Sequence, residues 1–499
     1  MMFKRMTVRI ALGLLSAMLA WVVFHRIQVP LFADAIYLHY GAYLIGEHGF
    51  VPYRDLFEIN FPLTYLVHVL IGKAFGFGEF AFRLFGFLSL FGLFALISRL
   101  LAPIHRAVGW FVALAFGLLY LSNANYFFQR DFLVLIPAIF IIQSTLKLTE
   151  SRDMMKHPWL GLGAWAALAA LIKPHYVVIL PVALLNVFMF FKLPWSQKML
   201  ARGIARMALG FSIPVVLIIA GLWHLDGWDA FVELVLEYMP LYAEFKNEIQ
   251  PILFFRSVNV WAVVFVFAMN VLSFWEKDEK TKSWLRTFSI FFLLGCFIGA
   301  VQGYGRYYYL FSHLMFFAVL GISMTMRPRL QRSRLPAAAL GLLPVGLGVW
   351  AFCQLYFLAV FLPNAKHVHR SGTNDNLLRK DFIVSYFEQH TTGQETIQPY
   401  HWSWPITAAL LDLERPIATK YICALQFHHG EEYPYIRGCK DDFVDIITLD
   451  MPDYFVVYLD NVKWRMLPDV QEILNECYVM DAEEMGVGIY KRKPCTDEE

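Results

Sequence analysis

The sequence predicts a polytopic α-helical membrane protein with about eleven transmembrane helices and a small C-terminal α/β domain. Hydrophobic residues make up 58% of the 499 positions and charged residues only 16%, which is too apolar for a soluble enzyme of this length. Apolar stretches long enough to cross a bilayer recur along the chain. After about residue 362, charged residues and short alternating runs replace them.

The apolar stretches predict the individual helices. The first follows a basic N-terminus but precedes no small-x-small cleavage site, so we interpret it as an uncleaved span. Clusters of Lys and Arg fall on one side of the membrane when each helix is counted once, which predicts a cytoplasmic N-terminus and an extracytoplasmic C-terminus. The predicted helices are 10–25, 82–98, 107–122, 132–147, 159–172, 175–191, 207–224, 259–275, 287–300, 308–326 and 336–358.

Two domains follow from this pattern. Residues 1–362 are predicted to form a transmembrane catalytic domain, and residues 363–499 a soluble extracytoplasmic α/β domain. Within the first, residues 26–81 form a long aromatic outer loop, in which we expect short amphipathic helices lying in the membrane interface. A second outer loop, 225–258, is acidic and aromatic and is suited to cover a site.

The predicted soluble domain has its own sequence signals. Residues 375–389 predict a helix, and 453–458 and 486–490 predict strands. An extracytoplasmic location permits disulfides, but free thiols remain an equal alternative because spacing does not give connectivity. The four cysteines of this domain are Cys423, Cys439, Cys477 and Cys495.

Several function classes receive no support. A formal net charge of +2 gives no electrostatic footprint for a nucleic-acid partner. The chain has no GxGxxG, Walker loop, CxxC pair or HExxH motif. ATP-driven transport is therefore not expected.

Charged residues gather at the predicted outer end of the helices. Ionisable groups near a membrane are costly unless function holds them there. Carboxylates beside several cations suit a reaction in which an anionic phosphate leaves and a hydroxyl nucleophile needs a base. The residues of this kind are Asp34, Arg54, Asp55, Glu58, Arg83, Arg130, Asp131, Lys173, His175, Arg306 and His313.

Some of these residues have structural alternatives. Asp34 could cap a helix or pair with Arg26, and Arg130-Asp131 begins an apolar helix, where capping or topology competes with function. Lys173 has no positive-inside reason to lie at an outer end, which favours phosphate binding. Arg306, in a tyrosine-rich segment, must reach outward or meet an anion.

Four motifs together resemble the GT-C superfamily of membrane glycosyltransferases, specifically glycosyltransferase family 39, the bacterial relatives of protein O-mannosyltransferases, and the lipid A aminoarabinose transferases. They are an acidic residue after the first helix (Asp34), GFVPYRDLFEINFPLTYL, FGFGEFAFRL and ALIKPHYVVILP. The resemblance spans about residues 10–360. The chain departs from the family at Asn60-Phe61-Pro62, where many relatives have Lys or His before two prolines, and it keeps a Tyr-His-x-x-Pro pattern near His313 only loosely.

The resemblance implies roles for individual residues. Asp34 would be the general base or acceptor-positioning acid, and Asp131 its acidic partner in the second outer loop. The donor phosphate would be bound by Lys173 and Arg306, with Arg83 positioning the first loop. His175 is a further candidate phosphate ligand, and the remaining candidates for substrate or loop contacts are Arg54, Asp55, Glu58 and Arg130.

The predicted activity is transfer of a sugar from a polyprenyl-phosphate-linked donor to a lipid, polysaccharide or protein acceptor, with inversion at the anomeric carbon. The resemblance implies a multi-pass protein of the cell inner (plasma) membrane acting on its periplasmic or extracytoplasmic face. A divalent cation at Asp34, Asp55, Glu58 or Asp131 is an open alternative to metal-free chemistry, and no other cofactor is expected. Two other function classes stay open: a transporter or flippase for lipid-linked sugars, and a catalytically silent scaffold.

Overall fold

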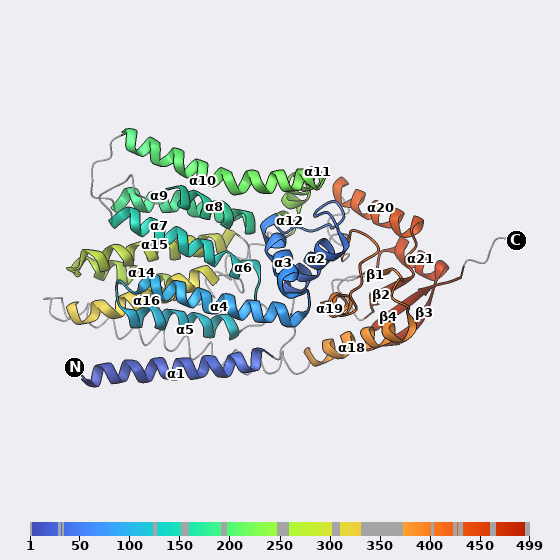
Figure 1. Cartoon of the computed structure of the whole chain (residues 1–499), viewed down its shortest axis with the longest axis horizontal. Helices are drawn as coiled ribbons and strands as arrows, with labels where there is room; N and C mark the ends of the chain where they lie inside the picture. The colour runs from blue at the N-terminus through green and yellow to red at the C-terminus, as the bar shows by residue number, and fades with distance from the viewer. Residues whose placement is uncertain are drawn as a thin grey trace.

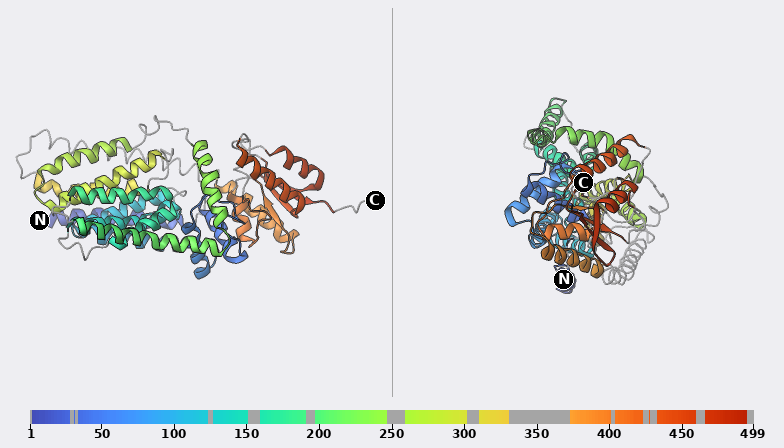
Figure 2. Two further views of the ribbon diagram at one scale, coloured as in Figure 1. Left: turned by 90° about the horizontal axis from the view of Figure 1, so that it is seen from above. Right: turned by 90° about the vertical axis from the view of Figure 1, so that its right-hand side faces the viewer.

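The computed structural model describes residues 2–27, 31, 34–122, 127–150, 159–190, 197–246, 259–301, 310–330, 373–400, 404–422, 427, 433–459 and 466–494. Figure 1 shows an elongated molecule with a helical bundle at one end and a sheet-containing C-terminal region at the other. The left view of Figure 2, from above, also shows the two regions at opposite ends of the long axis. Helices α2 and α3 lie between them (Figure 1).

The bundle consists of helices whose apolar side chains form one large core. Within the described residues, five helical segments are long and apolar enough to cross a membrane: Arg9–Arg26, Glu79–Leu101, Arg130–Glu150, Gln197–His224 and Glu279–Gly299. The bundle elements are α1 (Met2–Arg26), α4 (Glu79–Leu101), α5 (Arg106–Ser122), α6 (Arg130–Leu133), α7 (Leu135–Glu150), α8 (Trp159–Ile172), η3 (Pro174–Val178), α9 (Ile179–Phe190), α10 (Gln197–His224), α14 (Asn259–Leu272), η5 (Ser273–Trp275), α15 (Glu279–Val301) and α16 (Leu310–Leu330).

The predicted apolar segments up to 308–326 coincide with these elements over their described residues, some of them spanning two elements, whereas 336–358 lies outside the described residues. The largest differences are at N-terminal ends. Helix α10 begins at Gln197 and α15 at Glu279, about two turns or more before the predicted starts. Their first turns carry charged residues, which a search for apolar runs leaves out.

Helices α8 and α10 pack with their backbones almost in contact. A Cβ atom added to Gly163 of α8 would lie 1.9 Å from the carbonyl oxygen of Met207, and one added to Gly210 of α10 would lie 2.0 Å from that of Leu160. Glycine is therefore required at both positions, since any side chain would force the helices apart. Small residues have this role in many membrane helix pairs.

The first outer loop folds into α2 (Asp34–His48) and α3 (Pro62–Phe75). The prediction of amphipathic helices lying in the interface is wrong for α2, because every residue from Ala35 to Leu44 is buried. Helix α2 packs against α3 on one side and against α19 of the C-terminal region on another. The second outer loop forms α11 (Trp228–Glu233), a π-helical turn η4 (Leu234–Tyr238) and α12 (Met239–Lys246).

The C-terminal region contains a four-stranded sheet with strand order β1-β2-β4-β3. Strands β1 and β2 pair in parallel, and the other two pairings are antiparallel. The predicted helix at 375–389 and strands at 453–458 and 486–490 correspond to α18, β2 and β4. The elements are α18 (Thr373–His390), β1 (Ile397–Pro399), α19 (Trp404–Asp412), α20 (Pro434–Leu449), β2 (Tyr454–Tyr458), α21 (Pro468–Cys477), β3 (Tyr478–Glu484) and β4 (Val487–Arg492).

The cysteines of this region are only partly described. Cys439 and Cys477 are free thiols, and Cys439 is buried. Cys423 and Cys495 lie outside the described residues.

Candidate functional site

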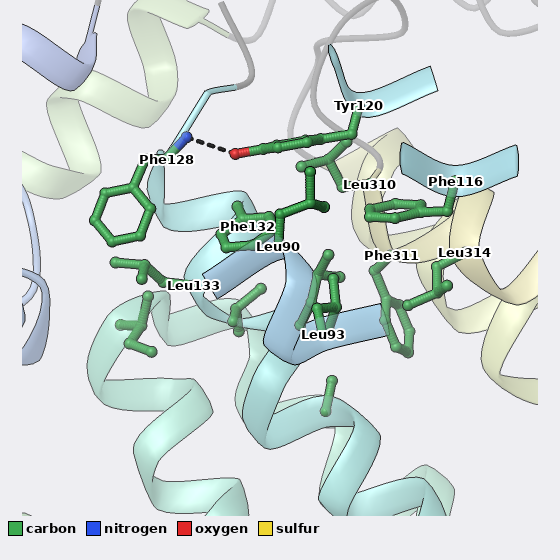
Figure 3. Close-up of a cluster of buried hydrophobic side chains, with 14 of the residues drawn as sticks. Leu90, Leu93, Phe116, Tyr120, Phe128, Phe132, Leu133, Leu310, Phe311 and Leu314 are labelled. Atoms are coloured by element: carbon green, nitrogen blue, oxygen red, sulfur yellow. Dashed lines mark hydrogen bonds between the residues drawn. The ribbon is translucent and has the colours of Figure 1, made fainter. Parts of the chain in front are cut away.

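A buried aromatic cluster fixes the turn that precedes the candidate site. Phe128 has a φ of 51°, in the left-handed region that non-glycine residues seldom adopt. Its backbone N–H donates a 2.7 Å hydrogen bond to the hydroxyl oxygen of Tyr120 (Figure 3). The Tyr120 ring stacks on Phe132 with centroids 4.8 Å apart. These contacts on both sides of Arg130-Asp131 fix the start of α6.

Asp131 and Lys173 form a buried ion pair at the end of the bundle nearest the C-terminal region. Lys173 Nζ lies 2.6 Å from Asp131 Oδ1, and the two side chains are only 8% and 7% exposed. Lys173 follows the last residue of α8 and precedes Pro174, where the chain changes from α8 to the 3-10 turn η3. A hydrogen bond of 3.3 Å from the Thr64 hydroxyl to the Ile172 carbonyl joins α3 to this corner.

Asp34 and Arg130 complete a cluster of opposite charges around this pair. Asp34 is the first residue of α2 and is half-buried, as is Arg130. Electrostatic interactions join Arg130 to Asp34 and Asp131, and join Lys173 to Asp34 as well as to Asp131. Arg26, the alternative partner considered for Asp34, donates a 2.6 Å hydrogen bond to the Leu121 carbonyl.

Glu58 enters the same cluster from the first outer loop. Its carboxylate accepts a 2.5 Å hydrogen bond from the Asn60 amide, and the carbonyl of Asn60 accepts one of 2.7 Å from the Tyr53 hydroxyl. Burial raises the pKa of Glu58, and the Asp34 carboxylate acts in the same direction, whereas hydrogen bonding to Tyr65 and Asn60 and the charge of Arg130 oppose the rise. Glu58 therefore takes up a proton more readily than an exposed glutamate.

We name the five residues Asp34, Glu58, Arg130, Asp131 and Lys173 the charged cluster. They come from α2, the first outer loop, α6 and the α8–η3 corner. Three are carboxylic acids and two are cations. His175 of η3 lies close enough to interact electrostatically with Lys173 and Arg130. The charged cluster and His175 thus bring together six of the predicted site residues.

Arg54 and Asp55 form a separate clamp. Arg54 Nε lies 2.8 Å from Asp55 Oδ1, and its Nη1 lies 3.1 Å from Asp226 Oδ2 beyond the end of α10. The Asp55 carboxylate also accepts a 2.9 Å hydrogen bond from the backbone N–H of Val51. These contacts tie the first outer loop to the second, so the roles predicted for Arg54 and Asp55 in substrate contact stay predictions.

Arg83 has partners other than the charged cluster. Arg83 pairs with Glu79 one turn earlier in α4 and donates a 3.0 Å hydrogen bond to the Ile27 carbonyl. His313 lies half-buried in α16, and Arg306 falls outside the described residues. The predicted phosphate-binding roles of Arg83 and Arg306 therefore stay predictions.

Two contributors to the site were not predicted. Tyr65 of α3 interacts with Glu58, and Tyr242 of α12 interacts electrostatically with Arg130. Both tyrosines lie in segments rich in aromatic residues, which look like interface anchors in the sequence alone. In the part of the chain that the structure describes, no three His, Cys, Asp or Glu side chains converge as a metal site would require.

Comparison with solved structures identifies the fold. The chain is similar to the crystal structure of ArnT from Cupriavidus metallidurans bound to undecaprenyl phosphate, with a TM-score of 0.55 and 13% identity over 96% of this chain and 97% of that one. The apo state of ArnT from Cupriavidus metallidurans aligns over the same shares with 13% identity and a TM-score of 0.39. No protein-family model matches the sequence, and no curated protein does.

At this level of identity the similarity concerns the fold. The chain has the fold of ArnT, so the predicted resemblance to the aminoarabinose transferases is confirmed at the level of the fold. Together with its apolar helices, this fold makes the chain an integral membrane protein.

Proposed function

We propose that this protein is a membrane glycosyltransferase that moves a sugar from a polyprenyl-phosphate-linked donor to a lipid, polysaccharide or protein acceptor on the outer face of the membrane. The charged cluster is the observation that carries the proposal. Arg130 and Lys173 are two cations at one end of an apolar bundle, beside three carboxylic acids. An anionic phosphate and a hydroxyl group that must lose a proton need this combination. The ArnT fold, known with undecaprenyl phosphate bound, supports the choice of lipid class.

The roles within the cluster follow from the contacts of each side chain. Asp131 is engaged with Lys173 at 2.6 Å, so we assign it to orienting that cation. Asp34 is half-buried at the start of α2 and is assigned the role of general base. Lys173 and Arg130 would neutralise the phosphate, because cations acting where water is excluded stabilise developing charge strongly.

The reaction balances with these groups alone. The acceptor oxygen attacks the anomeric carbon, and its proton passes to the Asp34 carboxylate. The bond between that carbon and the phosphate oxygen breaks, and polyprenyl phosphate leaves with the bonding electrons. A single displacement inverts the anomeric centre. On this proposal, residues 1–362 carry the chemistry and residues 363–499 border the acceptor entrance.

The test is transfer of radiolabelled sugar by the purified protein in detergent. Donors are a panel of polyprenyl-phosphate sugars, and the acceptor is crude cell-envelope material. The variants are Asp34→Asn and Asp131→Asn, with Asp226→Asn as a matched control because its carboxylate is 86% exposed and belongs to the separate clamp. We expect turnover by wild type and by the control, and its loss in Asp34→Asn.

Two results would contradict the proposal. Turnover that survives in Asp34→Asn would remove the assigned base. No turnover with any donor, together with saturable lipid-sugar binding that neither cluster variant changes, would favour the transporter instead.

A further inference from the structure

Phe57 connects the C-terminal region to the charged cluster. Its backbone N–H donates a 2.8 Å hydrogen bond to the carbonyl oxygen of Lys420. Its ring packs on Tyr421 at 5.4 Å and on Tyr238 at 5.1 Å between centroids. It is packed against both the core of the C-terminal region and the smaller core beneath the second outer loop. One side chain thus contacts two parts of the chain that lie far apart in sequence.

The C-terminal side of this contact is firmly anchored. The Tyr421 hydroxyl donates a 2.8 Å hydrogen bond to Asp442 of α20, and Lys420 Nζ lies 3.0 Å from the same carboxylate. The Tyr421 carbonyl accepts a 3.0 Å hydrogen bond from the side chain of Gln398 in β1. Lys420 and Tyr421 are therefore fixed to both the sheet and α20, and form a rigid surface for Phe57.

The other side of the contact leads directly to the cluster. Glu58 follows Phe57 and has a different set of partners, Asn60, Tyr65 and the charges of Arg130 and Asp34. Phe57 therefore turns toward the C-terminal region while the next side chain turns toward the cluster. Because Phe57 and Glu58 are adjacent in the chain, a shift of the Phe57 backbone displaces the backbone that carries Glu58.

We propose that Phe57 is a positioning residue through which the C-terminal region holds Glu58 in the charged cluster. This inference rests on the proposed glycosyltransferase function. The C-terminal region then takes a direct part in the reaction, because Lys420 and Tyr421 position the Glu58 carboxyl group of the membrane domain through Phe57. Misplacing a group by about 1 Å can cost up to about a hundredfold in rate.

The test compares Phe57→Leu with Phe455→Leu. Phe455 is a buried ring of β2 in the core of the C-terminal region and packs on Tyr478 at 5.1 Å between centroids, so the control loses a ring from that core at a different residue pair. At equal folded fraction we expect Phe57→Leu to lower kcat about tenfold. Phe455→Leu should leave kcat unchanged. In a Glu58→Gln background, Phe57→Leu should cause no further loss of kcat. A residue that acts through Glu58 has no effect on the rate once that carboxylate is gone.

A second measurement does not depend on activity. Hydrogen–deuterium exchange of residues 57–65 should rise in Phe57→Leu and stay unchanged in Phe455→Leu. Wild-type kcat in Phe57→Leu, or an equal loss in both Glu58 backgrounds, would overturn the positioning role while leaving the proposed function intact. If wild type transfers no sugar at all, the proposed function fails, and unchanged exchange at 57–65 would then overturn the connection as well.

Discussion

The buried pair of Asp131 and Lys173 makes a sharp prediction about stability. Both side chains are less than a tenth exposed, and their charged atoms are 2.6 Å apart. Neutralising one partner leaves the other charge buried, which costs about 3–5 kcal/mol in the free energy of unfolding. Removing both charges leaves neither Asp131 nor Lys173 as a buried charge without its partner. The double variant Asp131→Asn/Lys173→Met should therefore be more stable than either single variant.

The two single variants should not be equal. Without Lys173, the Asp131 carboxylate still lies beside Arg130, which retains part of the compensation. Without Asp131, Lys173 keeps the attraction of Asp34 but experiences the stronger opposing effect of Arg130, a like charge that disfavours the charged form of Lys173. We therefore expect the loss in the free energy of unfolding to lie at the upper end of this range for Asp131→Asn and at the lower end for Lys173→Met.

The assay is denaturant unfolding in mixed micelles, with the double-mutant cycle as the readout. Arg54→Met/Asp226→Asn is the matched control, because those side chains are 45% and 86% exposed and such ion pairs contribute little. If the double variant loses as much stability as the two single variants added together, Asp131 and Lys173 are not coupled and the description of the cluster fails.

Three further predictions concern packing, a buried hydrogen bond and pH. Gly163→Ala should destabilise the chain by about 1–3 kcal/mol, because its Cβ would lie 1.9 Å from a carbonyl oxygen of α10, whereas Gly221→Ala has open space and should be silent in thermal unfolding. Tyr120→Phe should cost about 1–3 kcal/mol in denaturant unfolding by leaving the buried N–H of Phe128 without its acceptor. Backbone N–H donors lower the pKa of Glu395 to about 2. The contribution of this carboxylate to the stability of the folded chain is therefore complete above the ordinary glutamate pKa and is lost as pH falls toward 2. In acid unfolding followed by circular dichroism, Glu395→Gln should lose less stability than wild type over that pH range.

Each of these has a contradicting result. Equal melting temperatures for Gly163→Ala and Gly221→Ala would mean that α8 and α10 are not in close contact. Unchanged stability in Tyr120→Phe would mean that water or another acceptor satisfies Phe128. Identical acid-unfolding curves for Glu395→Gln and wild type would mean that this carboxylate gains nothing from folding.

Some of the site could be predicted from the sequence because charge in an apolar chain is conspicuous. Asp131 and Lys173 stand out at the ends of apolar segments, yet their contact crosses 42 positions, and no local pattern reports it. Arg83 pairs with Glu79 at a four-residue spacing, which places both side chains on one helix face and is visible in the sequence, whereas its phosphate-binding role stays a prediction. For α2, residues 35–44 have no polar face, a pattern typical of a helix buried on all sides, and the prediction of an interfacial helix overlooked it.

The contact between Phe57 and Lys420 could not be predicted in the same way. It joins a loop of the membrane region to a loop that follows a helix in the C-terminal region, 363 positions later in the chain. Neither partner carries a motif, since one is an aromatic residue among many and the other contributes only a backbone carbonyl. Only the fold places them together.

The charge balance of the cluster limits what it can bind. Asp34, Asp131 and Glu58 face Arg130 and Lys173, so with all groups ionised the five residues carry one excess negative charge and would repel a phosphate. Burial raises the pKa of Glu58, and protonation of that carboxyl group makes the balance neutral. An approaching anion raises the pKa further and so promotes its own binding. When the donor bond breaks and the phosphate gains a second negative charge, the proton released by the acceptor is the only new positive charge available, which makes its capture by a cluster carboxylate part of stabilising the leaving group.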